Sequence, residues 1–184
     1  MDDLATTEAE KYRQIWDRPE YRKFSPGLGE CEAAFTACGM ASGQALIDFG
    51  AGTGRASAWF VERGLSVVAV DHAANALECD VYFVRACLWE MPAMLADFGF
   101  CCDVMEHIPP SRVDDVLRAI RARVSGRCYF GIATRPDVMG RLIGKPLHLS
   151  VHSGDWWAAK LSEFWGAVDV RRNDARDFVA VVSE

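Results

Sequence analysis

No two cysteines in this chain have the C-x-x-C spacing, although seven cysteines occur among its 184 residues. That spacing is typical of thiolate zinc sites and redox-active pairs, and an odd number of cysteines argues against a disulfide framework. We therefore expect the thiols to be reduced and mostly buried, as in a cytoplasmic protein. They belong to Cys31, Cys38, Cys79, Cys87, Cys101, Cys102 and Cys128.

Long apolar runs and a basic excess are also missing. No stretch approaches the roughly 20 apolar residues that a membrane-spanning helix needs. The first residues, MDDLATTEAEK, are acidic and polar, unlike a secretory signal, so we expect a cytoplasmic protein without a membrane partner. The net charge of −6 argues against a broad nucleic-acid-binding face.

Repeats, low-complexity tracts and linkers are absent too, and the length suits one α/β domain. We expect residues 1–40 to form an N-terminal helical cap and residues 45–184 to form the core. Strands are expected at 45–47, 66–71, 82–87, 99–104, 127–133, 167–170 and 177–183, and helices at 7–16, 30–38, 111–123 and 155–165. This alternation predicts a mostly parallel sheet with helices on both faces, which binds ligands beyond the carboxyl ends of its strands.

The most informative segment that is present is ALIDFGAGTGRAS, residues 45–57. Its apolar run ends at Asp48, glycines follow at Gly50, Gly52 and Gly54, and a helical pattern begins at about Arg55. This pattern predicts a buried strand, a tight turn and a helix N-terminus. Glycine permits positive φ and lets a ligand lie against the backbone, while the free N–H groups of a helix start favour an anionic group.

The segment DFGAGTG resembles the first motif of class I S-adenosylmethionine-dependent methyltransferases, an acidic residue followed by G-x-G-x-G. A nicotinamide or flavin site is the alternative, although its G-x-G-x-x-G fingerprint fits less well. Asp71 ends the second predicted strand, where the family's acidic residue accepts hydrogen bonds from both ribose hydroxyls. The resemblance implies a Rossmann-like α/β fold with an antiparallel last strand, and S-adenosylmethionine as cofactor.

The resemblance also implies which residues bind the cofactor. Asp48 would lie near the methionine ammonium, and His72 would lie either against the adenine or in solvent. The third motif departs from the family pattern, because Cys87 and Leu88 stand where an aspartate and a large apolar residue bind adenine. Cysteine is a poor acceptor, so a backbone carbonyl, water or Glu90 would take that role. The expected set is Asp48, Phe49, Gly50, Ala51, Gly52, Gly54, Asp71, His72, Cys87, Leu88 and Asp103.

The segment CDVMEHIPP, residues 102–110, resembles the E-V-L-E-H-[IV]-P segment of ubiquinone-pathway O-methyltransferases and of small-RNA 2′-O-methyltransferases. In the RNA-methylating family, a later histidine before an acidic–aromatic pair completes a magnesium site, and His152 has a similar setting here. The resemblance implies that Mg²⁺ is bound by Asp103, Glu106, His107 and His152.

Two other interpretations of this segment stay open. In the first, the segment lines a metal-free pocket in which His107 or His152 is the catalytic base; in the second, it is purely structural. His148 is expected to be a packing or loop residue. Asp103 is followed by Val104, so the [DNS]-P-P-[YFW] motif of DNA base methylation is missing.

We therefore expect a methyltransferase that acts on the oxygen of a small hydroxylated or nucleotide-like acceptor. A nitrogen acceptor is less favoured. The alternatives are metal-assisted methylation of an RNA ribose and a non-catalytic module that binds S-adenosylmethionine in a larger complex.

Overall fold

A single seven-stranded sheet, in the order β3-β2-β1-β4-β5-β7-β6, organises the computed structural model, which describes residues 3–184. β1 to β5 are parallel to one another, whereas β7 runs antiparallel to both β5 and β6. This confirms the predicted Rossmann-like α/β fold. The strands are β1 (Ala45–Phe49), β2 (Ser66–Asp71), β3 (Phe83–Arg85), β4 (Ala96–Cys102), β5 (Val124–Ala133), β6 (Ala167–Asn173) and β7 (Asp177–Ser183).

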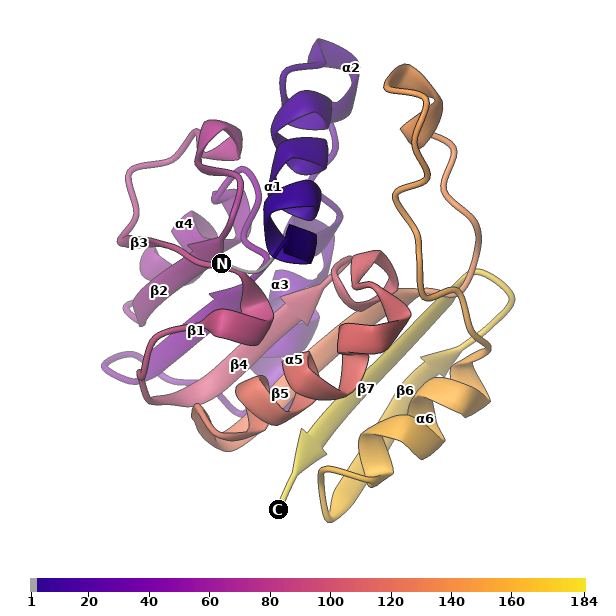
Figure 1. Cartoon of the computed structure of the whole chain (residues 1–184). Coiled ribbons are helices and arrows are strands. Elements are labelled where there is room, and N and C mark those ends of the chain that lie inside the picture. The colour runs from indigo at the N-terminus through magenta and orange to yellow at the C-terminus, as the bar shows by residue number, and fades with distance from the viewer. Residues whose placement is uncertain (1–2) are drawn as a thin grey trace.

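Helices cover both faces of the sheet, as Figure 1 shows. α3 and α4 pack on one face, whereas α5 and α6 pack on the other. The helices are α1 (Asp3–Trp16), α2 (Pro19–Arg22), α3 (Pro26–Cys38), α4 (Arg55–Val61), α5 (Val113–Arg121) and α6 (Gly154–Ser162). None of the helices within residues 3–184 is long and apolar enough to cross a membrane.

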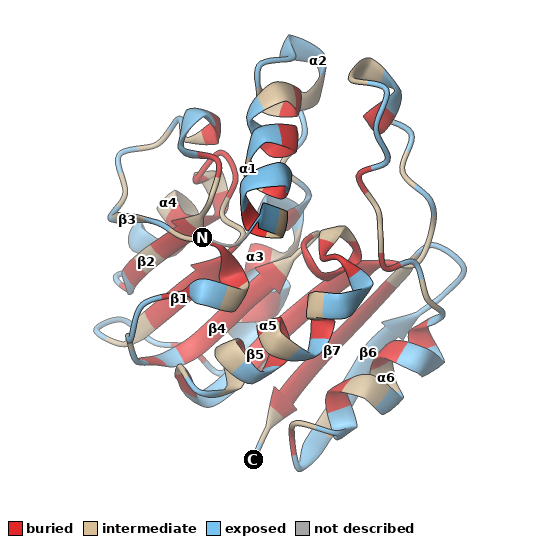
Figure 2. Ribbon diagram, viewed as in Figure 1, coloured by how far each residue is buried: buried red, intermediate tan, exposed pale blue. Residues whose placement is uncertain are grey.

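The two faces of the sheet have separate apolar cores, because successive strand residues point to opposite sides. On one face Phe100 of β4 lies between Phe60 of α4 and Tyr129 of β5, with ring centroids 5.2 and 5.8 Å away. On the other face the next residue of β5, Phe130, packs against Trp165 at 5.4 Å. The central strands β1, β4, β5 and β7 are largely buried between these two helical layers, whereas the edge strand β6 is mostly exposed (Figure 2).

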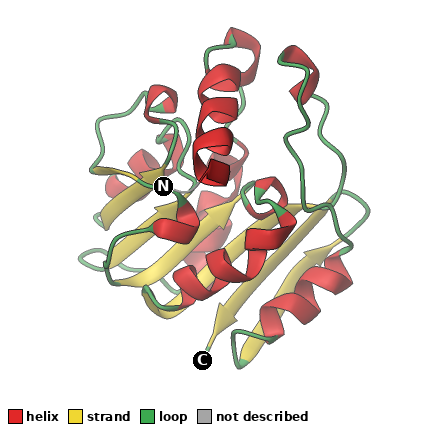
Figure 3. Ribbon diagram, viewed as in Figure 1, coloured by secondary structure: helices red, strands yellow, loops and turns green. Residues whose placement is uncertain are grey.

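The carboxyl edge of the parallel strands is covered by α1, α2 and the long segment 134–153, which is mostly loop (Figure 3). A third apolar cluster joins these pieces, with Tyr12 and Ile15 of α1 packed against Leu147. α3 belongs instead to the layer that covers the sheet. Of the expected cap, whose residues 3–40 the structure describes, α1 and α2 therefore lie over the strand ends, whereas α3 packs on the sheet and only its first residues, Pro26 and Gly27, line the second of the two cavities described below.

The chain reverses its direction across the sheet between β1 and β4. β2 and β3 follow on one side of β1, whereas β4 and β5 follow on the other. The loops after β1 and β4 therefore diverge and leave a crevice between them, which is where ligands of such sheets bind.

Candidate active site

The loop after β1 has the conformation that its glycines predict. Gly50, Gly52 and Gly54 have φ values of 74°, 51° and 76°. A Cβ on Gly50 would lie 2.5 Å from Val104 Cγ2, and one on Gly52 would lie 3.0 Å from Trp16 Cζ2. Neither position has room for a side chain, so bare backbone faces the crevice.

Asp71 joins this loop to the end of β2. Its two carboxylate oxygens accept hydrogen bonds from Gly52 N–H at 2.9 Å and from Ala73 N–H at 2.8 Å. Asp48 is more deeply buried and accepts a hydrogen bond from the Ser57 hydroxyl at 2.6 Å. Burial, followed by the nearby charge of Asp71, raises the pKa of Asp48 to about 7.

Two adjoining cavities open onto the loop. The first cavity, of about 90 Å³, is lined by Asp71, His72, Cys87 and Leu88, and by Glu8 and Tyr12 of α1. The second cavity, of about 340 Å³, is lined by Asp48, Ala51 and residues of the 134–153 segment. Both cavities share Trp16, Tyr21, Gly50, Gly52, Asp103 and His107.

Most of the predicted cofactor residues therefore line one cavity or the other, but two do not. Phe49 is fully buried in the core beneath the loop. Gly54 is the N-cap of α4, and a Cβ there would meet Leu77 at 2.8 Å. Both residues shape the turn without facing either cavity.

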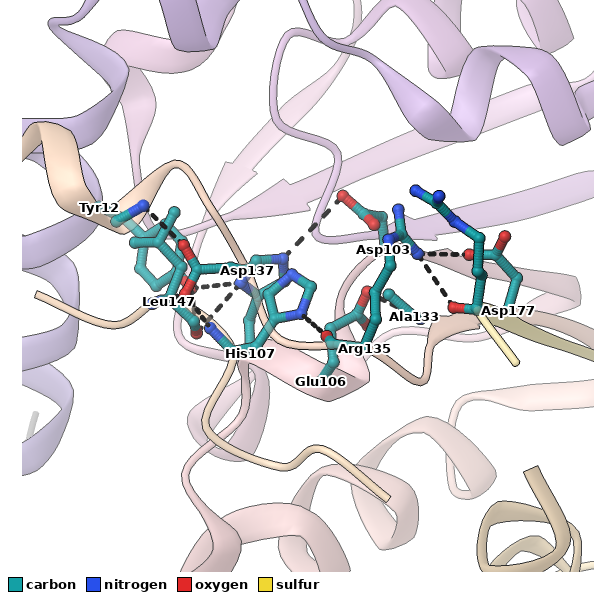
Figure 4. Close-up of polar contacts among 12 residues, drawn as sticks. Tyr12, Asp103, Glu106, His107, Ala133, Arg135, Asp137, Leu147 and Asp177 are labelled. Carbon is teal, nitrogen blue, oxygen red and sulfur yellow. Dashed lines mark hydrogen bonds and ion pairs between the residues drawn. The ribbon is translucent and has the colours of Figure 1, made fainter. Parts of the chain in front are cut away.

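His107 lies where the two cavities meet. It ends a short 3-10 helix of one turn, Met105–His107, which comes soon after β4. Its Nδ1 is 2.7 Å from the Tyr12 hydroxyl and 3.2 Å from the Leu147 carbonyl oxygen. Its Nε2 is 4.0 Å from Asp103 Oδ2 (Figure 4). Burial alone would raise the pKa of Asp103, but the adjacent His107 outweighs burial and lowers that pKa to about 2.

Asp103 reaches this position through an unusual backbone conformation. Its φ is 60°, which makes it the one non-glycine with positive φ among residues 3–184. Aspartate tolerates the left-handed region better than most side chains. The Asp103 N–H donates to Gly131 O at 2.8 Å, which fixes the turn against β5.

Glu106 and His148 complete the polar group around His107. Glu106 is fully buried and accepts a hydrogen bond from Ala133 N–H at 3.0 Å. Burial, then the charge of Asp103, raises the pKa of Glu106 well above its usual range. The His148 ring lies edge-on to His107, with centroids 4.6 Å apart, and its Nδ1 is 2.7 Å from Arg135 O. Burial is the main cause that lowers the pKa of His148, and the electrostatic effect of the neighbouring His107 lowers it further.

His152 is not brought to this group. Its ring stacks on Trp156 with centroids 3.7 Å apart, and it lines neither cavity. The reason is local. Ser153 is the N-cap of α6, and its hydroxyl accepts a hydrogen bond from Trp156 N–H. This cap keeps His152, the residue before it, beside the start of the helix. Of the expected set of Asp103, Glu106, His107 and His152, the structure brings the first three together and places His148, not His152, beside His107.

Sequence reasoning missed Glu8 and Asp137. Glu8 lines the first cavity and forms a buried ion pair with Lys11 at 2.5 Å, which the i,i+3 spacing of opposite charges could have indicated.

Asp137 accepts from Gly140 N–H and Leu147 N–H, at 2.6 and 2.9 Å, and so folds the 134–153 segment back on itself. No local pattern in the sequence predicts that second contact.

Comparison with known proteins gives no match to a family model and no match in sequence to a curated protein. Solved structures do match in fold. The DhpI complex with S-adenosylhomocysteine has a TM-score of 0.72 at 18% identity, covering 97% of this chain and 95% of that one. The 1,6-didemethyltoxoflavin-N1-methyltransferase of Burkholderia thailandensis, bound to 1,6-didemethyltoxoflavin and S-adenosylhomocysteine, has a TM-score of 0.68 at 16% identity, covering 98% and 87%.

A third similar structure is the magnesium protoporphyrin IX methyltransferase of Synechocystis with bound S-adenosylhomocysteine. Its TM-score is 0.67 at 16% identity, covering 98% of this chain and 95% of that one. The chain therefore has the fold of S-adenosylmethionine-dependent methyltransferases over nearly its whole length.

Proposed function

We propose that this chain is an S-adenosylmethionine-dependent methyltransferase that methylates an oxygen of a small hydroxylated acceptor. The observation that carries this proposal is the pairing of Asp71 with the glycine loop at the edge of two cavities that meet at His107. The first cavity would hold the adenosine of the cofactor, and the second its methionine end and the acceptor.

The cofactor would be held by groups of complementary charge. The Asp71 carboxylate can accept from ribose hydroxyls, since each oxygen has acceptor capacity beyond its present single N–H contact. Asp48 in the second cavity would pair with the methionine ammonium, whose positive charge favours the ionised carboxylate. Leu88 and Cys87 would line the adenine site, with a backbone N–H rather than an aspartate marking its edge.

In the reaction, the acceptor hydroxyl would lose its proton to His107 Nε2 as its oxygen attacks the methyl carbon. The carbon–sulfur bond breaks, its electron pair stays on sulfur, and S-adenosylhomocysteine leaves. The Asp103 carboxylate, 4.0 Å from Nε2, stabilises the imidazolium that forms. Because the sulfonium is already activated, most of the catalysis consists of aligning the two substrates and excluding water.

A small acceptor suits the second cavity. Its walls are largely apolar, with Trp16, Tyr21 and Phe100 among them, and its polar groups include His148 and Arg135. A volume of about 340 Å³ must also admit the methionine end of the cofactor, which limits the acceptor's size. A nitrogen acceptor would fit the same cavity, because the same base can take a proton from nitrogen.

A divalent cation such as Mg²⁺ is a second candidate for activating the acceptor. Glu106, His107 and His148 offer ligand atoms that lie within 4.8 Å of one another. Glu106 Oε2 is buried without a hydrogen-bond partner among the described residues, so this oxygen is available as a ligand. Calorimetric titration with Mg²⁺ or Mn²⁺ tests this candidate: it requires binding that His148→Ala weakens and His152→Ala does not.

The decisive experiment is methyl transfer by the isolated chain from labelled S-adenosylmethionine to a panel of small phenols, alcohols and amines. Asp71→Asn is expected to weaken cofactor affinity at least tenfold, because the amide has one acceptor oxygen where the carboxylate has two. The exposed Asp80→Asn is the matched control. Cofactor binding without transfer to any acceptor would favour the non-catalytic module, and absence of binding would refute both.

A further inference from the structure

We propose that Tyr12, on helix α1, is a positioning residue for the methyl-transfer reaction: it holds the His107 imidazole with Nε2 unprotonated and directed toward the acceptor. This inference rests on the proposed function. It extends that function by making the N-terminal helix a part of the catalytic apparatus, in addition to its role as a cover over the strand ends.

The hydrogen bonds around His107 Nδ1 assign the position of its proton. Nδ1, the Tyr12 hydroxyl and the Leu147 carbonyl oxygen form a triangle with sides of 2.7, 3.2 and 3.3 Å. The carbonyl can only accept. If Tyr12 donated to Nδ1, the carbonyl would receive no hydrogen and would face the nitrogen without a proton between them.

The opposite arrangement satisfies all three groups. Nδ1–H donates to the Tyr12 oxygen, and the Tyr12 hydroxyl donates to Leu147 O. The neutral imidazole then carries its lone pair on Nε2, the atom that faces the two cavities. Asp103 Oδ2 lies 4.0 Å from Nε2, too far to hold a proton there by a hydrogen bond, so in this state its charge attracts a proton to Nε2 without fixing one. Nε2 is the atom which must accept the acceptor's proton.

Tyr12 can serve as this fixed partner because its own surroundings hold it. It is 8% exposed, and its ring lies 5.1 Å from His72 and 5.7 Å from His107, the latter edge-on. It also packs with Ile15 and Leu147 in the third apolar cluster. Burial raises the pKa of Tyr12 well above its usual value, so the phenol keeps its proton.

The same face of α1 reaches the cofactor side. Glu8, Tyr12 and Trp16 follow one another at intervals of four residues, which places them on one face of the helix. All three line the first cavity, and Trp16 lies against Gly52 of the cofactor loop. When α1 packs over the cofactor, it therefore also brings the Tyr12 hydroxyl to His107. Cofactor binding and orientation of the base thus depend on the same face of α1.

Tyr12→Phe tests this role, because it removes only the hydroxyl and leaves the ring to pack on His72. We expect kcat to fall about tenfold while the KM for S-adenosylmethionine changes less than twofold. The exposed Tyr82→Phe is the control, since the Tyr82 side chain is 70% exposed and lies outside both cavities.

The tautomer of His107 gives a direct readout that needs no turnover. Nitrogen-15 NMR of metal-free protein with labelled histidine, assigned through His107→Gln, is expected to show hydrogen on Nδ1 in the wild type and a mixture of tautomers in Tyr12→Phe. A wild-type imidazole protonated at Nε2, or an unchanged kcat in a folded Tyr12→Phe, would overturn the inference. Failure of the proposed function is a separate result: the wild type would then bind no cofactor whatever its tautomer.

Discussion

Three aspartates around the cofactor loop have different surroundings, and their roles differ accordingly. Asp71 has two backbone N–H donors, Asp48 has one hydroxyl donor and deep burial, and Asp103 faces an imidazole. The pKa of Asp48 is raised to about 7, whereas that of Asp103 is lowered to about 2. Asp103 therefore remains charged at neutral pH, whereas Asp48 keeps a proton far more readily until a cation approaches.

The raised pKa of Asp48 predicts a pH-dependent affinity for S-adenosylhomocysteine. Below pH 7 the free protein holds a proton on Asp48, and that proton must leave before the carboxylate can pair with the ligand's ammonium. We expect the affinity, measured by calorimetry, to rise up to tenfold per pH unit between about pH 5 and pH 7 and to level off above it.

Asp48→Asn is the control for this prediction, because the amide has nearly the same shape and does not titrate. Its affinity should be weaker at pH 8 and flat across the range. The same shift affects folding with the opposite sign: the folded state holds the proton more tightly than the unfolded chain, so this group's contribution to stability falls as pH rises from about 4 to about 7. Identical pH profiles for the two proteins would contradict the assignment of Asp48 to the ammonium.

Among the elements, those with a periodic pattern were predictable from the sequence. β2 has the predicted bounds, Ser66–Asp71, and the apolar stripe of α5 is buried as its helical spacing indicates. β4 begins at Ala96, three residues before the predicted start of the strand. The prediction started too late because the exposed Asp97 interrupts the apolar pattern of the sequence. That residue is held in the strand by a distant contact, its carboxylate accepting from Ala45 N–H at 2.8 Å.

The candidate site was predictable only where it follows from a motif in one segment. The glycine loop, Asp71 and His107 belong to such segments. His148 does not, since the long-range hydrogen bonds of Asp137 determine the path of its loop. The contact of Tyr12 with His107 joins residues 95 positions apart, and helix periodicity can place Tyr12 on an apolar face but cannot name its partner.

At the scale of elements, α1 is expected to be stabilised by the cofactor. Its inner face lines the first cavity, and its other contacts run mainly to short loop segments. We predict that saturating S-adenosylhomocysteine slows amide hydrogen exchange in α1, because its local opening would expose the bound ligand. The control is the set of α6 amides that exchange by local opening, because α6 lies away from both cavities and stabilisation against global unfolding does not slow local exchange. Equal protection of both helices, or protection of neither, would contradict a role for α1 as a cover over the bound ligand.

For the whole molecule, one rigid sheet supports a site made almost entirely of loops. The loops after β1, β2, β3 and β4 each contribute residues to the cavities, and the switch in strand order between β1 and β4 separates them enough to admit a ligand. A ligand that fills this crevice contacts segments from both halves of the sheet. Its binding should therefore stabilise the cooperative unit and not one element alone.

Thermal unfolding measures this global effect. A ligand that binds only the folded state, at a concentration 100 times its Kd, stabilises it by about 2.7 kcal/mol. For a chain of this length that corresponds to a rise in Tm of about 5–10 °C. We expect S-adenosylhomocysteine to produce such a rise, NAD⁺ at the same concentration to produce none, and Asp71→Asn to lose most of it. A larger shift with NAD⁺ would assign the glycine loop to a dinucleotide instead, since Asp71 ends the strand that meets the ribose in both kinds of site.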